Sequence, residues 1–154
     1  MQTREQEYAL RSHKQIQELD MPSINKVYRD QYGALCHKLP ILIRTAGLTQ
    51  ALAFVATRKG EGPYNGPFHR LLHDLALTVG YKDGDTAETS AEARLLAASR
   101  TAHLSEYMYL TQRVLAALVW YKRFAESVLD VTADADLEAT GTGPATPSPV
   151  GGTS

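Results

Sequence analysis

Hydrophobic positions recur along most of the chain with the 3.6-residue period of an α-helix, and no segment alternates as a β-strand does. The longest periodic segment runs from Ser105 to Leu129 and is apolar around most of its circumference. Its polar residues fall on one narrow stripe, formed by Ser105, Gln112, Arg123 and Ser127. Because so apolar a helix must be surrounded by others, the pattern predicts that it lies at the centre of a helical domain.

Earlier segments also carry helical patterns, and cap or breaker residues mark their ends. We expect these helices over 2–19, 24–46, 48–59, 67–79 and about 90–100. Ser23 is placed to cap the second helix and Pro67 to begin the fourth, while Thr89–Glu92 matches a capping box. Gly33 weakens the second helix, and Pro40 is expected to kink or end it. The sequence therefore predicts an all-α protein, a single compact bundle of about six helices.

The end of the chain differs in composition from the rest. Residues 131–154 contain no aromatic residue and are rich in Thr, Gly, Pro and Ser, so we expect a helical domain over 1–130 followed by a disordered tail. The single cysteine, Cys36, excludes an internal disulfide. We see neither a signal-peptide pattern at the start nor an apolar run long enough to cross a membrane. These features predict a cytoplasmic protein without a membrane partner.

Charge is distributed unevenly along the chain, although the formal net charge is only −1. Residues 1–60 hold nine Lys/Arg and five Asp/Glu, a balance of +4. The remaining residues have a balance of −5. Such asymmetry indicates a basic and an acidic face, although a mixed surface divided at one point gives the same numbers by chance.

One motif resembles a hydrolase site. His69 and His73 lie four residues apart on one predicted helix, and Asp74 follows directly. Phosphohydrolases of the HD type use such a His-Asp pair to hold a divalent metal that activates water, and here His37 and Asp130 are the candidates for the remaining ligands. The simpler interpretation, which we prefer, places the two histidines at the edge of the core.

The remaining candidate motifs for catalysis are weaker. Cys36 and His37 are adjacent on a helix and therefore point about 100° apart, which does not suit a nucleophile and its base. A buried free cysteine is the better interpretation of Cys36. The glycine-containing segment 60–66 lacks the Lys-Ser/Thr of a phosphate-binding loop. We therefore expect no catalytic residues, no metal site and no cofactor.

Basic residues form a more suggestive pattern. Lys26, Arg29, His37 and Arg44 share about one-third of the circumference of the second predicted helix. Lys38 lies beside this row, and Arg58 and Lys59 end the next helix. Together these residues are candidates for an RNA-binding groove that contacts phosphates, and the alternative is a solvated basic helix face.

Two strings resemble a known family. The first is Lys38-Leu39-Pro40-Ile41-Leu42-Ile43-Arg44-Thr45-Ala46-Gly47-Leu48, followed by Ala51-Leu52-Ala53-Phe54. The second is Tyr107-Met108-Tyr109-Leu110-Thr111, which leads to Trp120-Tyr121-Lys122-Arg123-Phe124-Ala125. Over roughly residues 5–130 the chain resembles the small all-helical subunit of the type III-B CRISPR effector, the RAMP-module (Cmr) complex.

The resemblance implies a non-catalytic part in antiviral defence. In such complexes several copies stack head to tail as a minor filament beside the larger subunits that hold the guide RNA. The basic face lies along the guide and target RNA, and other subunits cleave the target. Lys38 and Arg44 match the family string and rank first as RNA contacts, whereas Lys26, Arg29, Arg58 and Lys59 follow from the helix-face pattern. The alternatives are an HD-type phosphohydrolase and a helical adaptor without RNA contact.

Overall fold

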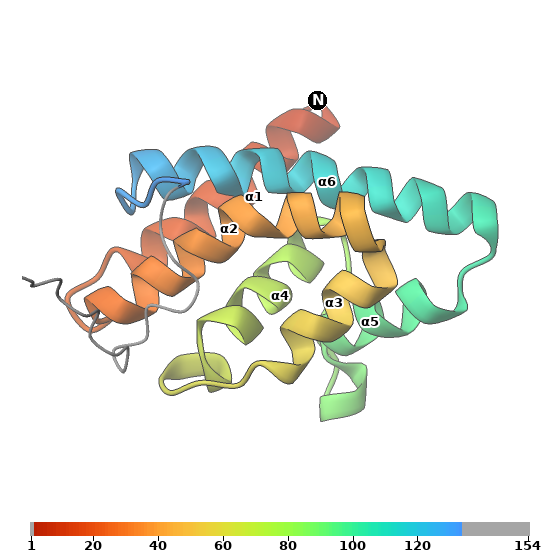
Figure 1. Cartoon of the computed structure of the whole chain (residues 1–154), viewed down its shortest axis with the longest axis horizontal. Coiled ribbons are helices and arrows are strands. Elements are labelled where there is room, and N and C mark those ends of the chain that lie inside the picture. Colours follow the sequence, from red (N-terminus) through yellow and green to blue (C-terminus); the bar gives the residue numbers. More distant parts are fainter. Residues whose placement is uncertain (1, 134–154) are drawn as a thin grey trace, which may run out of the picture.

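The computed structural model describes residues 2–133, and this part of the chain holds six α-helices and no β-strand (Figure 1). The α-helices are α1 (Arg4–Leu19), α2 (Lys26–Ala46), α3 (Leu48–Thr57), α4 (Pro67–Thr78), α5 (Ala91–Thr101) and α6 (Leu104–Ser127). Two short 3₁₀ turns, η1 (Pro63–Asn65) and η2 (Ala87–Thr89), precede α4 and α5. The prediction of an all-α bundle is confirmed. The proposed disordered tail lies outside the described residues, apart from its first three positions.

Helix starts follow local capping chemistry, with two differences from the sequence prediction. Pro67 is the first residue of α4, as expected. The cap of α2 is Asn25 rather than Ser23, and its side chain accepts a hydrogen bond from the backbone N–H of Tyr28. Ser90, not Thr89, caps α5: its side chain accepts a hydrogen bond from the backbone N–H of Ala93, and Thr89 belongs to the preceding 3₁₀ turn. The expected capping-box glutamate, Glu92, contacts His73 of α4 instead.

α2 continues through both residues that were expected to interrupt it. Gly33 and Pro40 are buried within the helix, which bends partway along its length (Figure 1) and ends only at Ala46. α3, α4 and α6 all pack against α2. This tertiary packing offsets the hydrogen bond that proline cannot donate. Gly47 then joins α2 to α3 with a φ of 91°, a conformation that favours glycine.

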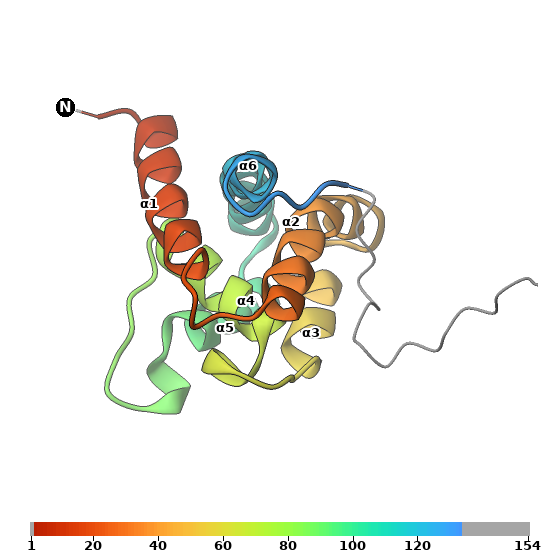
Figure 2. The ribbon, with the colours of Figure 1, turned by 90° about the vertical axis from the view of Figure 1, so that its left-hand side faces the viewer.

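The centre of the bundle is α4, so the prediction that the long C-terminal helix lies there was wrong. Ten of the twelve residues of α4 are buried, and α4 contacts every other α-helix. In α6 only six of 24 residues are buried. α6 instead lies across α1 and α2 on one side of the bundle (Figure 2). Away from this contact, α6 exposes apolar residues, including Leu104 and Met108, which are 74% and 55% exposed.

The chain after α6 returns onto α2. The backbone N–H of Val131 donates to the carbonyl of Ala125, and the Val131 side chain is buried beside Gly33. A Cβ atom on Gly33 would lie 2.5 Å from the Cβ of Val131, so the absence of a side chain at Gly33 allows this close approach. No helix within residues 2–133 is long and apolar enough to span a membrane.

Candidate nucleic-acid interface

The two cations in the first turns of α2 both lie near carboxylates. The ammonium group of Lys26 is 2.7 Å from the Asp30 carboxylate, and this pair is solvent-exposed. The guanidinium of Arg29 is 3.9 Å from the carboxylate of Asp20. Exposed pairs of this kind contribute little to stability, so a phosphate can compete for either cation.

The middle of the expected basic row is covered. His37 is buried, and its Nε2 atom donates to the backbone carbonyl of Val131 over 2.9 Å. Val131 also covers Gly33, one turn earlier on the same face. The row from Lys26 to Arg44 therefore does not form one continuous surface, and His37 has a structural role.

Lys38 and Arg44, the two residues that match the family string, lie toward the end of α2. Lys38 is half-buried and Arg44 is exposed in the last turn. Ile41, between them in sequence, is 59% exposed. This end of α2 therefore offers two cations beside an apolar residue.

A surface cleft lies where the beginning of α2 meets the end of α3 and the beginning of α4. Its lining residues are Asn25, Val27, Tyr28, Gln31, Arg58, Lys59, Gly60, Glu61, Pro67 and Phe68. Phe68 is buried at the start of α4, and the Arg58 guanidinium lies 5.0 Å from the centre of its ring. The Tyr28 hydroxyl donates to the carbonyl of Pro63, and burial raises the pKa of Tyr28 to about 12. The cleft thus combines apolar and amide side chains with the cations Arg58 and Lys59 and one carboxylate, that of Glu61.

The structure therefore separates the six sequence-predicted cations into two groups. Lys26 and Arg29 lie in the first turns of α2, and Arg58 and Lys59 line the cleft at the same end of that helix. Lys38 and Arg44 lie nearer its other end. An RNA strand that contacts all six cations must therefore pass over the middle of α2, where Val131 covers Gly33 and His37.

The residues of the HD-type pattern do not come together. The Asp74 carboxylate accepts hydrogen bonds from the Tyr32 hydroxyl over 2.7 Å and from Nε of Arg70 over 3.1 and 3.2 Å. Asp74 is buried, and its bonds point into the core between α2 and α4. His37 bonds to the segment after α6 instead. The expected ligands therefore form no common metal site, and Asp74 organises the core.

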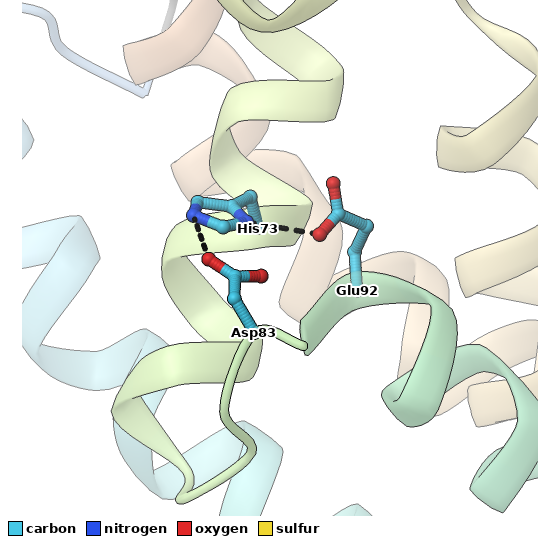
Figure 3. Close-up of side chains that lie close together, drawn as sticks. All are labelled: His73, Asp83 and Glu92. Carbon is cyan, nitrogen blue, oxygen red and sulfur yellow. Dashed lines mark hydrogen bonds and ion pairs between the residues drawn. The ribbon is translucent and has the colours of Figure 1, made fainter. Parts of the chain in front are cut away.

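His73 has different partners from those expected (Figure 3). Its Nδ1 atom is 2.9 Å from a carboxylate oxygen of Glu92, and its Nε2 atom is 3.5 Å from Oδ2 of Asp83. Sequence reasoning missed both carboxylates, because one lies in the loop after α4 and the other in the first turn of α5. The expectation of partly exposed histidines at the core edge holds for His69, which is half-buried, whereas His73 is buried.

Cys36, the single cysteine of the chain, is fully buried. Burial raises the pKa of its thiol well above the usual value, so the thiolate, which is the nucleophilic form, is disfavoured. The interpretation of Cys36 as a buried free cysteine is confirmed.

Comparison with known proteins identifies the family. The family model for CRISPR-associated protein (Cas_Cmr5) matches residues 4–128. The chain belongs to this Cmr5 family. The Cmr subunit Cmr5 of the CRISPR system of Thermus thermophilus is 39% identical over 132 residues, which cover 84% of this chain and 99% of the relative. This result confirms the resemblance found in the sequence.

The fold agrees with that assignment. The crystal structure of a CRISPR-associated Cmr5 family protein from Thermus thermophilus matches with a TM-score of 0.67 and 38% sequence identity. The match covers 83% of this chain and 98% of the Thermus chain. The helices α1 to α6 all lie within the residues that the family model matches.

Proposed function

We propose that this protein is a non-catalytic structural subunit of a type III-B CRISPR ribonucleoprotein effector. In this proposal several copies stack as the minor filament and contact the backbone of the guide and target RNA. The observation that carries it is membership of the Cmr5 family over residues 4–128. The Thermus relative is itself a CRISPR system Cmr subunit.

The RNA contact is assigned to the basic residues of α2 and of the cleft. Base pairing between guide and target selects the sequence in such effectors, so a subunit of this kind needs to recognise phosphates and sugars rather than base edges. Lysine and arginine side chains suit that task. Lys38 and Arg44 supply cations at one end of α2, and Arg58 and Lys59 supply them at the other.

The arrangement of the titratable residues supports a role without catalysis. The carboxylate of Asp74 is engaged by Tyr32 and Arg70 inside the core, and the Cys36 thiol is fully buried. Neither group faces the cleft that Arg58 and Lys59 line. The chemistry of target cleavage is therefore assigned to other subunits.

A single copy is expected to bind RNA weakly. For a single strand, the logarithm of the affinity falls by about 0.7 per contacted phosphate for each unit of log salt, because each contact releases counterions. A copy that contacts few phosphates therefore gains little affinity from counterion release. Several copies on one strand gain affinity through effective concentration. Weak binding by the isolated chain and firm retention in the assembled complex are thus expected together.

Charge reversal tests the RNA contact. We expect Lys38→Glu combined with Arg44→Glu to leave the fold intact, because neither side chain is fully buried, and to reduce guide RNA retained by the purified complex at moderate salt. The matched control is Lys14→Glu combined with Lys82→Glu. It makes the same charge change on α1 and on the loop after α4, away from α2 and α3 (Figure 2). Equal retention in both double variants would favour an adaptor without RNA contact.

A further inference from the structure

His73 is held in one orientation by neighbours on three segments. Glu92, in the first turn of α5, contacts its Nδ1 atom over 2.9 Å (Figure 3). The Tyr64 ring packs against the imidazole with ring centroids 5.0 Å apart. The imidazole is about nine-tenths buried. Because a carboxylate accepts hydrogen bonds, the short contact assigns a proton to Nδ1.

The other ring nitrogen faces a second carboxylate across a longer distance. Nε2 lies 3.5 Å from Oδ2 of Asp83, and within the described residues Nε2 makes no hydrogen bond. Oδ1 of Asp83 accepts the backbone N–H of Ala91 over 2.8 Å, which fixes the carboxylate and leaves Oδ2 directed at His73. With one proton on Nδ1, the Nε2 position and Oδ2 of Asp83 face each other as two acceptors, which either a second proton on Nε2 or a metal ion can join.

We propose that Nε2 of His73 and Oδ2 of Asp83 bind a divalent transition-metal ion of the zinc class. Two ligands that are each about 2.1 Å from a tetrahedral zinc ion are roughly 3.4 Å apart, which agrees with the observed separation of these atoms. One ligand atom from each of His73, Asp83 and Glu92 lies within 4.8 Å of the others. The position is thus distinct from the HD-type set, which used Asp74.

Glu92 has the role of an orienting residue in this site. Histidines that bind a metal usually donate their second ring N–H to a carboxylate, which fixes the tautomer and raises the basicity of the ligating nitrogen. The Nδ1 contact with Glu92 has this arrangement. Asp83 is 48% exposed, so water completes the coordination. Imidazole with carboxylate and water favours zinc, nickel or copper over magnesium.

The site connects three segments that are separate in sequence. His73 lies in α4, Asp83 in the following loop and Glu92 in α5. A bound ion therefore fastens this loop and the start of α5 to the central helix. No metal site is expected from the sequence, where His73 stands beside Asp74 in a weak motif and Asp83 follows ten positions later in a loop.

Titration of the full-length protein with Zn²⁺ tests the proposal. After treatment with a chelator and its removal, calorimetry at neutral pH is expected to show one equivalent of Zn²⁺ bound. His73→Gln and Asp83→Asn should each weaken binding at least tenfold, and loss of the orienting carboxylate in Glu92→Gln should weaken it about 10- to 100-fold. The matched control is His103→Gln, an exposed histidine that should leave binding unchanged.

Nuclear magnetic resonance of the unmodified protein supplies a readout that does not depend on whether the variants fold. Addition of Zn²⁺ should shift the Nε2 nitrogen resonance of His73 while Nδ1 stays protonated. Millimolar Mg²⁺ should leave that resonance unchanged. Absence of Zn²⁺ binding, binding that survives His73→Gln, or an unchanged His73 resonance at saturation would overturn the proposal.

Discussion

The buried carboxylate of Asp74 makes stability depend on pH. Desolvation is the largest influence and raises the pKa of this carboxyl from 3.8 to about 6, although Arg70 and Tyr32 lower it in part. Because the folded-state pKa lies above the unfolded-state value, the contribution to stability is fully present below about pH 3.8 and is lost as the pH rises through 6. Ionised Asp74 therefore costs stability at neutral pH, whereas its hydrogen bonds keep the core in register.

Asp74→Asn should remove this pH dependence. Between pH 4.5 and 7.5 the free energy of unfolding of the variant is expected to rise relative to the parent by about 2 kcal/mol, since one pKa unit corresponds to about 1.4 kcal/mol. Urea unfolding of both proteins at the two pH values measures the difference. Asp85→Asn, which removes an exposed loop carboxylate, shows how much of the change comes from net charge alone. If the free energy of unfolding changed equally in Asp74→Asn and in the parent between the two pH values, the raised pKa of Asp74 would be refuted.

The close packing of Gly33 against Val131 leads to a second prediction at the scale of single residues. In an open helix, Gly→Ala stabilises by about 1 kcal/mol. Here the added Cβ meets the Val131 side chain, so we expect Gly33→Ala to displace the segment after α6 and to cost roughly 1–2 kcal/mol through lost burial. Val131→Gly should destabilise the parent but have little effect in the Gly33→Ala background. Thermal unfolding of the four proteins measures this coupling, and a higher midpoint for Gly33→Ala would contradict it.

At the scale of elements, α3 begins without a side chain of its own as a cap. Gly47 occupies the cap position, and the Tyr107 hydroxyl from α6 accepts the backbone N–H of Thr49 over 3.1 Å. The interaction with the Thr49 side chain, followed by this backbone bond, lowers the pKa of Tyr107. Tyr107 therefore does for α3 what a serine or aspartate cap does in other helices.

Tyr107→Phe should remove this distant cap. We expect a loss of about 1 kcal/mol in the free energy of unfolding, the usual value for a helix cap, and faster hydrogen exchange at the Thr49 amide. Tyr81→Phe is the matched control, because the Tyr81 hydroxyl makes no side-chain hydrogen bond within residues 2–133. An unchanged Thr49 exchange rate would show that water replaces the phenol without cost.

Local signals located the six α-helices but could not predict the features that tertiary contacts determine. The period of apolar residues, Pro67 and Gly47 predicted the order and approximate bounds of all six α-helices. The continuation of α2 through Pro40 depends on three packed neighbours that no local rule describes. The composition of α6 likewise could not show that α4, and not α6, is surrounded on all sides.

At the scale of the whole molecule, the RNA contacts stay a prediction, and the sequence could not show the shape of the surface that carries the candidate residues. Helical spacing predicted that Lys26, His37 and Arg44 share one face of the second helix. It could not show that residue 131 returns to cover the middle of the same face. The pairing of His73 with Asp83 was inaccessible for a similar reason, since the loop conformation after α4 determines it.

The exposed side of α6 gives the final prediction, which rests on the proposed assembly. Leu104, Met108 and Val119 lie outside the buried face of α6 and are 74%, 55% and 42% exposed. Apolar rows of this kind on a soluble domain mark contacts with other proteins. Within a filament of several copies beside larger subunits, this row is available for burial against a neighbour.

We therefore expect Met108→Glu combined with Val119→Glu to leave helix content unchanged while reducing incorporation into the complex. Gln17→Glu with Gln50→Glu adds the same charge at exposed positions on α1 and α3, outside α6, and serves as the control. Co-purification with the larger subunits measures incorporation, and sedimentation of the isolated protein shows whether the row joins copies of the chain. Equal incorporation of both double variants would mean that assembly uses another face. RNA retention is compared only among variants that enter the complex normally. Loss of RNA then reports on the cations of α2 and not on failed assembly.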